Sequence, residues 1–237
     1  MRRMKQILMA AIFASALAGI DYTDTLQAAE TPLTDAIKQL QAAPNYSWTT
    51  TVDVPGAPFK VSPISGRVDT NGFAILVADA SEKVVLAKGV ARVLKSRWGW
   101  KRMTVGGTKD ATENDLFSAK TPTDELADLA TKLSDVKADG DHSFSGLLDT
   151  ASAKAYLLSS MKGRTPGGMT PEMTTVSGKF QLWLADGLPQ KYTLTIEAIV
   201  SLPFGKKDVA CTGTTQIKAV GTTTVEVPTE AKTLLEK

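Results

Sequence analysis

The stretch Val176-Ser177-Gly178-Lys179-Phe180-Gln181-Leu182-Trp183-Leu184 places apolar or small side chains at every second position. Residues 192–200, Tyr-Thr-Leu-Thr-Ile-Glu-Ala-Ile-Val, repeat this alternation after the turn residues 185–189. A period of two is typical of a strand that buries one side, and two such runs joined by a short turn predict an antiparallel hairpin. A third alternating run over residues 209–217 follows, so the C-terminal third of the chain predicts the main strands of a large antiparallel sheet.

Shorter runs extend this predicted sheet toward the N-terminus. We expect strands over residues 46–54, 65–69, 73–78, 83–87 and 91–94, a turn leading into 98–102, a strand through Phe144 and Leu147, and a last short strand over 222–227. Residues 163–171 contain several glycines and prolines and predict a surface loop.

Four helices are predicted at intervals along the chain. The first begins at Thr31-Pro32 and ends at Pro44, and the second begins at Thr121-Pro122 with its apolar face at Leu126, Leu129 and Leu133. The others cover residues 150–160 and 229–235. Because the helices do not alternate regularly with strands, we expect an α+β fold: a large curved antiparallel sheet, or half-barrel, with a few helices on its concave side.

The first residues predict an export signal. Arg2, Arg3 and Lys5 precede an apolar run over residues 7–20, which is shorter than the about 20 residues that a membrane-spanning helix needs. We expect residues 1–18 to be removed after Ala16-Leu17-Ala18, with cleavage after Ala29 as the alternative, and residues 30–237 to form a single domain. The predicted location is the periplasm or the exterior, and no cysteine nearby is available for a lipid anchor.

Removal of that signal changes the charge balance. The full chain has 27 basic and 25 acidic residues and a net charge of +2, whereas the chain without its first 18 residues has 24 basic and 25 acidic residues, or −1. A nearly neutral protein has no general attraction for nucleic acid. We therefore expect no nucleic-acid partner.

Residues able to support catalysis are few. The chain has one histidine, His142, within the turn-like stretch Asp139-Gly140-Asp141-His142-Ser143, and one cysteine, Cys211, in an alternating strand. A catalytic triad, a zinc site and an internal disulfide each need more than this. We expect Cys211 to be a buried small apolar residue, and we predict no enzyme activity, metal or cofactor. Acid–base catalysis by two carboxylates remains an open alternative, although no pair stands out.

The apolar face of the sheet is the first candidate site. If the few short helices cover it incompletely, a concave groove for an apolar ligand results. The alternative is that these side chains are ordinary core. The candidate lining residues are Trp48, Val52, Phe73, Leu76, Phe180, Leu182, Tyr192 and Leu194.

A second candidate site interleaves basic and aromatic side chains over residues 92–102. This mixture suits a membrane surface with anionic headgroups, and it also suits single-stranded nucleic acid, which export disfavours. The alternative is an edge strand whose charges prevent aggregation. The residues are Arg92, Lys95, Arg97, Trp98, Trp100, Lys101 and Arg102.

Three stretches resemble a known superfamily. Residues 181–192, Gln-Leu-Trp-Leu-Ala-Asp-Gly-Leu-Pro-Gln-Lys-Tyr, residues 221–228, Gly-Thr-Thr-Thr-Val-Glu-Val-Pro, and residues 99–102, Gly-Trp-Lys-Arg, resemble the periplasmic outer-membrane lipoprotein carriers (LolA-like) and the related mycobacterial lipid-carrier lipoproteins. The resemblance implies a half-barrel whose mouth is closed by helices and which binds a lipid. The carriers' lid-controlling arginine has no counterpart in the stretch 62–67, Ser-Pro-Ile-Ser-Gly-Arg, so that role is not transferred.

Two functional hypotheses follow. In the first, the exported protein binds an apolar or lipid ligand, such as an acyl chain, in the groove and acts as a carrier or sensor in the cell envelope, with a membrane surface or an envelope protein as partner. In the second, it is a structural or interaction module whose apolar face is fully covered, without a cavity of roughly 300 Å³ or more. A hydrolase that uses carboxylates ranks third, and a close acidic pair in a cleft would favour it.

Overall fold

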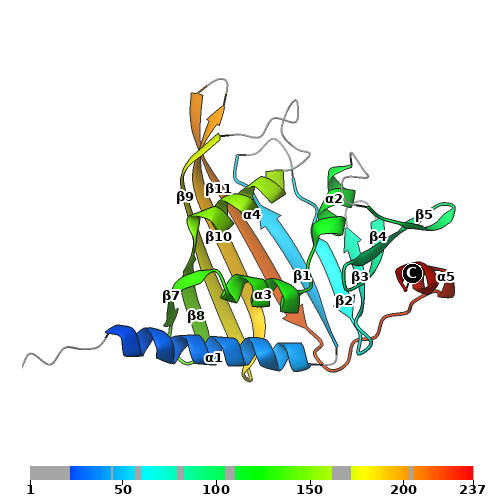
Figure 1. The fold of residues 1–237 in the computed structure, drawn as a ribbon, viewed down its shortest axis with the longest axis horizontal. Helices are drawn as coiled ribbons and strands as arrows, with labels where there is room; N and C mark the ends of the chain where they lie inside the picture. Colours follow the sequence, from blue (N-terminus) through cyan, green and yellow to red (C-terminus); the bar gives the residue numbers. More distant parts are fainter. Residues whose placement is uncertain are drawn as a thin grey trace, which may run out of the picture.

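The computed structural model describes residues 22–43, 45–56, 60–78, 83–104, 110–161, 172–202 and 205–236. The predicted signal of residues 1–18 and the predicted loop of residues 163–171 lie outside these ranges. The described residues form five helices and one 11-stranded sheet, in which every strand pairs antiparallel with its neighbours (Figure 1). The sheet is curved and not closed, because β6 and β7 are its two edges. The predicted α+β half-barrel is confirmed.

The strands follow a simple order across the sheet, β6-β5-β4-β3-β2-β1-β11-β10-β9-β8-β7. In each half, strands that follow one another in the chain pair with each other, and the pairing of β1 with β11 joins the halves. The bounds are β1 Tyr46–Asp53, β2 Ile64–Val68, β3 Phe73–Ala78, β4 Lys83–Lys88, β5 Ala91–Ser96, β6 Gly99–Arg102, β7 Leu133–Ala138, β8 Ser143–Leu148, β9 Glu172–Ala185, β10 Leu188–Leu202 and β11 Gly205–Lys218.

The predicted hairpin of β9 and β10 is confirmed. Leu182 lies opposite Tyr192, and Phe180 lies opposite Leu194, so the apolar positions of both strands share the concave face. Asp186 and Gly187 have φ values of 52° and 77° at the tip. Positive φ at two successive turn residues is what a two-residue Asp-Gly hairpin loop requires, and it fixes the register.

The helices lie on two sides of the sheet. Figure 1 shows α3 and α4 in front of the concave face and α1 across one end of it, whereas α5 lies apart, beyond β4 and β5. The C-terminal helix α5 instead packs on the outer face of β4–β6, which the sequence did not predict. The bounds are α1 Tyr22–Ala42, α2 Ala111–Ser118, α3 Pro122–Ala130, α4 Thr150–Met161 and α5 Thr229–Leu235.

The predicted start of the first helix at Thr31-Pro32 is wrong. Helix α1 begins at Tyr22 and runs through Pro32. A proline inside a helix removes one backbone hydrogen bond, but the preceding Ala28 and Ala29 are strong helix formers and the helix continues. The predicted buried face is confirmed, since Leu33, Ile37 and Leu40 are all buried.

Two further boundaries differ from the prediction. Helix α3 ends at Ala130, so Leu133 begins β7 instead of extending the apolar face of the helix; it still packs against the main core from the strand. Residues 223–228 form no strand. Val225 and Val227 alternate as predicted, but they pack on the outer face of the sheet, against the second cluster under α5.

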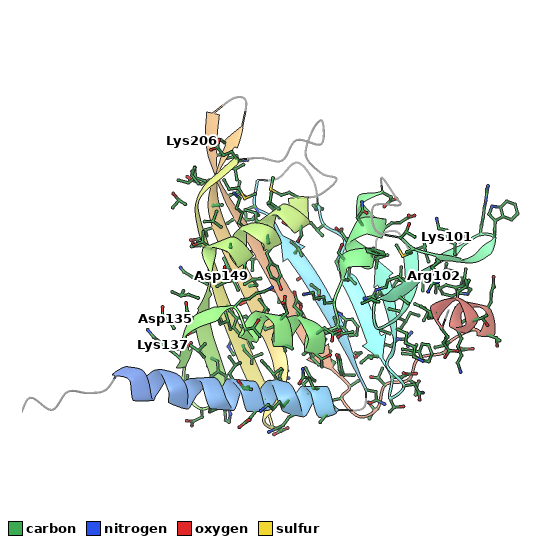
Figure 2. The ribbon with its side chains drawn as sticks, in the orientation of Figure 1. Lys101, Arg102, Asp135, Lys137, Asp149 and Lys206 are labelled. Carbon is green, nitrogen blue, oxygen red and sulfur yellow. The ribbon has the colours of Figure 1, made fainter. Side chains whose placement is uncertain are left out.

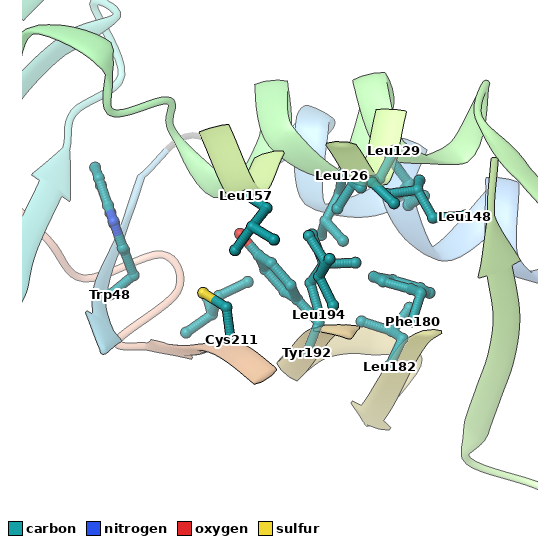
Figure 3. Packing of buried hydrophobic residues seen from close by; sticks show 14 of the residues in the cluster. Trp48, Leu126, Leu129, Leu148, Leu157, Phe180, Leu182, Tyr192, Leu194 and Cys211 are labelled. Atoms are coloured by element: carbon teal, nitrogen blue, oxygen red, sulfur yellow. The ribbon is translucent and has the colours of Figure 1, made fainter. Parts of the chain in front are cut away.

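The core has two parts because β3, β4 and β5 bury side chains on both faces. The main cluster lies between the concave face and α1–α4, and it includes Leu126, Leu129 and Phe180 (Figure 3). The second cluster lies under α5 and contains Phe73 and Leu235.

Candidate ligand-binding cavity

A cavity of about 700 Å³ lies between the curved sheet and the helices. Strands β1, β2, β10 and β11 form its floor, and α2, α3 and α4 form its roof. The floor is largely apolar and includes Trp48, Val52, Leu194 and Ile196. Figure 3 shows Trp48 standing apart from the close-packed side chains around Leu126 and Phe180.

Small side chains keep this space open. Helix α4 buries Ala153 and Leu157 in the core. At Ala151, Ser152 and Ala155 it presents small side chains to the cavity, and these side chains extend only a short way into it. The helix is fixed at its start by Asp149, whose Oδ1 accepts a hydrogen bond from the Ser152 backbone N–H at 2.8 Å. A hydrogen bond with the Ser152 side chain, together with this backbone bond, lowers the pKa of Asp149.

Trp48 forms one wall of the cavity, and Gly66 makes room for it. The two residues are cross-strand partners on β1 and β2. A Cβ atom on Gly66 would lie 2.1 Å from Cζ2 of the indole, a distance that no side chain can tolerate. The missing side chain therefore lets the indole lie flat on the neighbouring strand.

A polar cluster interrupts the apolar lining. The Tyr192 hydroxyl donates a hydrogen bond to Oε2 of Glu125, and the Tyr156 hydroxyl donates to the same carboxyl group. Tyr192 also interacts with the Thr215 hydroxyl, which lies 2.9 Å from that of Thr50. These groups come from α3, α4, β10, β11 and β1, so the fold brings them together from distant parts of the chain.

Burial sets the protonation of this cluster. Desolvation raises the pKa of Glu125, against the opposing effect of the hydrogen bond from Tyr192. Desolvation also raises the pKa of Tyr156 and of Tyr192, and the nearby Glu125 adds to both shifts. The cluster therefore favours its uncharged form.

A charged cluster lies beside it on the lining. Oδ2 of Asp128 is 2.8 Å from Nζ of both Lys120 and Lys132. These hydrogen bonds, led by that from Lys120, lower the pKa of Asp128. Glu125 and Asp128 thus lie one helical turn apart with pKa values shifted in opposite directions.

Comparisons with known proteins give the following matches. No family model and no curated protein sequence matches the chain. Among solved structures, LprF from Mycobacterium bovis is 13% identical, with 86% of this chain and 98% of that chain covered and a TM-score of 0.43. A LolA superfamily protein from Nitrosomonas europaea is 12% identical, with 84% and 94% covered and a TM-score of 0.34. The chain resembles both. These are weak, fold-level likenesses, of the kind that the sequence resemblance predicted.

The eight residues predicted to line a groove are placed in three different surroundings. Trp48, Val52, Tyr192 and Leu194 line the cavity. Leu76, Phe180 and Leu182 are packed within the main core. Phe73 faces α5 on the other side of the sheet. Residues 73 and 76 are three positions apart on one strand, so they point to opposite faces and cannot share a groove.

The most distinctive residue of the cavity, Glu125, was not among the predicted site residues. Its place in the first turn of α3 indicates by itself only a favourable interaction with the helix dipole. The signal that could have found it is its spacing, because Glu125 lies four residues before the buried Leu129 and so shares the buried side of α3. Tyr156 and the small residues of α4 carry no comparable signal.

The basic and aromatic residues of 92–102 do not share one face. The Arg92 guanidinium turns inward and donates to the carbonyls of Ala91 and Ala119, and Trp100 packs in the cluster under α5. Arg97 and Trp98 form the exposed tip of the β5–β6 hairpin. The exposed residues beside them are Lys95, Lys101 and Arg102, the last two labelled at the sheet edge in Figure 2.

The chemistry of the remaining candidates is limited. Cys211 is buried and free, as predicted, and burial raises the pKa of its thiol. His142 lies exposed in the turn between β7 and β8. Within the described ranges, no three His, Cys, Asp or Glu side chains gather closely enough to hold a metal ion, and no helix has the length and hydropathy needed to cross a membrane.

Proposed function

We propose that the protein binds an apolar or lipid molecule in the cavity between the sheet and α2–α4, and that it acts after export as a carrier or sensor in the cell envelope. The observation that carries this proposal is the cavity of about 700 Å³ with its largely apolar floor. Pockets for small ligands usually measure about 300–1,000 Å³. A module whose apolar face is fully covered would have no such space.

The lining supports an apolar occupant. Val52, Leu194 and Ile196 line the cavity. Side chains beside empty space lose dispersion contacts, which an acyl chain would supply. The residues proposed to contact the apolar part of the ligand are therefore Trp48, Val52, Tyr192 and Leu194, with Ile196.

Native mass spectrometry of gently purified protein, together with uptake of a fluorescent acyl probe, tests the proposal. We expect a co-purified lipid and saturable probe binding. The variant Ala155→Phe places a ring in the cavity and should weaken probe binding by roughly tenfold or more. Lys154→Phe adds the same ring to the neighbouring position, which does not line the cavity, and should leave binding unchanged. Equal binding by both variants would place the ligand elsewhere.

A hydrolase is the second candidate, because Glu125 and Asp128 are an acidic pair in a cleft with pKa values shifted in opposite directions. Such a divergence is a feature of acid–base pairs. Asp128 is already held by two lysines, however, which favours a binding role. Incubation with a monoacylglycerol separates the candidates: fatty-acid release that is lost in Asp128→Asn would favour hydrolysis, and binding without release favours the carrier.

We further propose that the tip of the β5–β6 hairpin touches an anionic membrane surface. Trp98 is 83% exposed, and the Arg97 guanidinium lies 4.7 Å from the centre of its ring. Tryptophan favours the membrane interface, and arginine pairs with phosphate. This surface, defined as Arg97, Trp98 and the exposed Lys95, Lys101 and Arg102, is smaller than the one predicted from the sequence.

A further inference from the structure

The cavity lining combines a largely apolar floor with the polar cluster formed by Glu125, Tyr156 and Tyr192, which lies beside the charged cluster around Asp128. All three residues line the cavity, and they approach from α3, α4 and β10. Both phenol hydrogens are directed at the same carboxyl group. Hydrogen-bonding capacity that remains on this carboxyl group is available to a molecule inside the cavity, because a carboxyl group has more acceptor sites than two phenols occupy.

The charges around the cluster decide what kind of polar group it suits. Lys120 and Lys132, the lysines of the lining, both bind Asp128. An anionic ligand head beside Glu125 would have to compete with Asp128 for these lysines. It would also lose its hydration at the position where burial already raises the pKa of Glu125, and the desolvation of a charged group is costly.

We propose that Glu125, Tyr156 and Tyr192 form the subsite for an uncharged head group, a hydroxyl or ester as in a monoacylglycerol or a long-chain alcohol, and that the cavity disfavours the carboxylate of a free fatty acid. The inference rests on the proposed function, since it assumes that an apolar chain occupies the rest of the cavity. A hydroxyl both donates and accepts, so it matches the mixture of donors and acceptors in the cluster. The burial that raises the pKa of Glu125 agrees with a neutral partner.

Displacement of the apolar dye N-phenyl-1-naphthylamine from the full chain tests the inference. Monopalmitoylglycerol, hexadecanol and palmitate carry the same chain length and differ in their heads. We expect the monoacylglycerol and the alcohol to displace the dye at roughly tenfold lower concentration than palmitate at neutral pH. Palmitate that competes equally or better would overturn the inference.

Variants locate the preference. Glu125→Leu removes every hydrogen-bonding atom and should abolish the difference between the competitors, whereas Glu125→Gln retains a donor and an acceptor and should retain a preference. Tyr192→Phe keeps the ring and should weaken the binding of monopalmitoylglycerol by roughly fivefold. Tyr46→Phe is the matched control, because the Tyr46 hydroxyl also binds α3, at Thr123 Oγ1 2.9 Å away, but lies outside the cavity lining.

The outcomes separate this inference from the proposed function. If the dye does not bind the wild-type protein, both fail. If the dye binds but the three competitors are equivalent, or if Tyr46→Phe changes the preference as much as Tyr192→Phe does, the cavity binds apolar ligands and only the head-group assignment fails. Should Glu125→Leu not fold, the Tyr192→Phe and Glu125→Gln variants decide the question.

Discussion

Trp48 and Gly66 illustrate how one missing side chain shapes the cavity. The indole is 3% exposed and occupies the space directly over Gly66. Its ring also lies 5.8 Å from that of Tyr46. Because the indole lies flat on β2 instead of pointing across the cavity toward the helices, it lines the cavity without filling it.

We expect Gly66→Ala to destabilise the protein by about 1–3 kcal/mol, since the new methyl group overlaps the indole and forces it to move. Urea unfolding followed by circular dichroism measures the free energy of unfolding. Gly213→Ala is the control: Gly213 also lines the cavity, but its Cβ would meet only the Leu194 carbonyl oxygen at 3.9 Å. Similar losses in both variants would contradict the role given to the Trp48 contact.

Glu125 should make stability depend on pH. Its folded-state pKa is raised above the usual 4.5, so the folded protein holds more protons than the unfolded chain. The free energy of unfolding therefore falls as pH rises above about 4.5. Glu125→Gln cannot titrate, and its stability relative to wild type should improve from about pH 5 to about pH 8 in urea unfolding.

Asp128→Asn should show the opposite dependence of stability on pH. The pKa of Asp128 is lowered from 3.8, so its contribution is present above that value and is lost as pH falls. The relative stability of this variant should improve toward acid. If both variants responded to pH in the same direction, the charge assignment of the cavity would be wrong.

At the scale of elements, α5 covers the outer face of the sheet. Leu235 and Ala231 pack with Phe73, Leu86 and Val93. The backbone N–H of Trp100 lies 3.4 Å from Glu230 Oε1, and Lys88 Nζ lies 3.3 Å from Glu236 Oε1. The helix thus closes the apolar outer side of β3–β6 and leaves the cavity on the other face untouched.

Leu235→Ala should lower the free energy of unfolding by about 2 kcal/mol or more, because it removes a buried leucine from a small cluster. Acyl-probe affinity should stay unchanged at temperatures where the variant is folded, since the cavity lies across the sheet. Lys232→Ala, at an exposed position of the same helix, should change stability by less than about 0.5 kcal/mol. A loss of probe affinity in Leu235→Ala would indicate that the two faces are coupled.

The elements that the sequence predicted best are those with long alternation. Strands β9, β10 and β11 form as expected because the predicted stretch of each alternates, with Phe180 and Leu182, Tyr192 and Leu194, and Cys211 and Ile217 buried in the main core. Helix α2 escaped prediction, since Ala111–Ser118 is short and, of the side chains described in it, only Leu116 is fully buried. Leu133 was misassigned because a spacing of four from Leu129 fits a helix, while the start of β7 is fixed by pairing with Leu148 far along the chain.

The cavity itself was only partly predictable. Alternation identifies which side chains face the concave side, and four of eight candidates do line the space. It cannot tell a packed position such as Leu182 from an open one such as Leu194, because that depends on where the helices lie above them. Glu125 and its two phenol partners come from three elements, and no local pattern links them.

At the scale of the whole molecule, the exposed hairpin tip lies apart from the cavity. Arg97 and Trp98 lie at the turn between β5 and β6, the edge of the sheet, whereas the cavity lies over β1, β2, β10 and β11. The proposed membrane contact and the proposed ligand site therefore use different residues, and each can be altered alone.

We expect Trp98→Ala to reduce co-sedimentation with vesicles containing phosphatidylglycerol by roughly fivefold, and high salt to weaken binding by the wild type. Vesicles of phosphatidylcholine alone should bind little of either protein. Val90→Ala is the control, because Val90 is 96% exposed at the opposite end of β5. Binding that persists in Trp98→Ala would assign membrane contact to another surface.

The pairing of β1 with β11 also governs how the chain can acquire its structure. Ser47 lies opposite Lys218 and Asp53 opposite Thr212, so the centre of the sheet joins residues from the two ends of the molecule. Contacts this distant in sequence form slowly. As the chain emerges residue by residue, β1 keeps an open edge until residues 205–218 arrive, and such edges invite aggregation. We therefore expect fragments that end before β11 to leave this edge of β1 unpaired and not to fold.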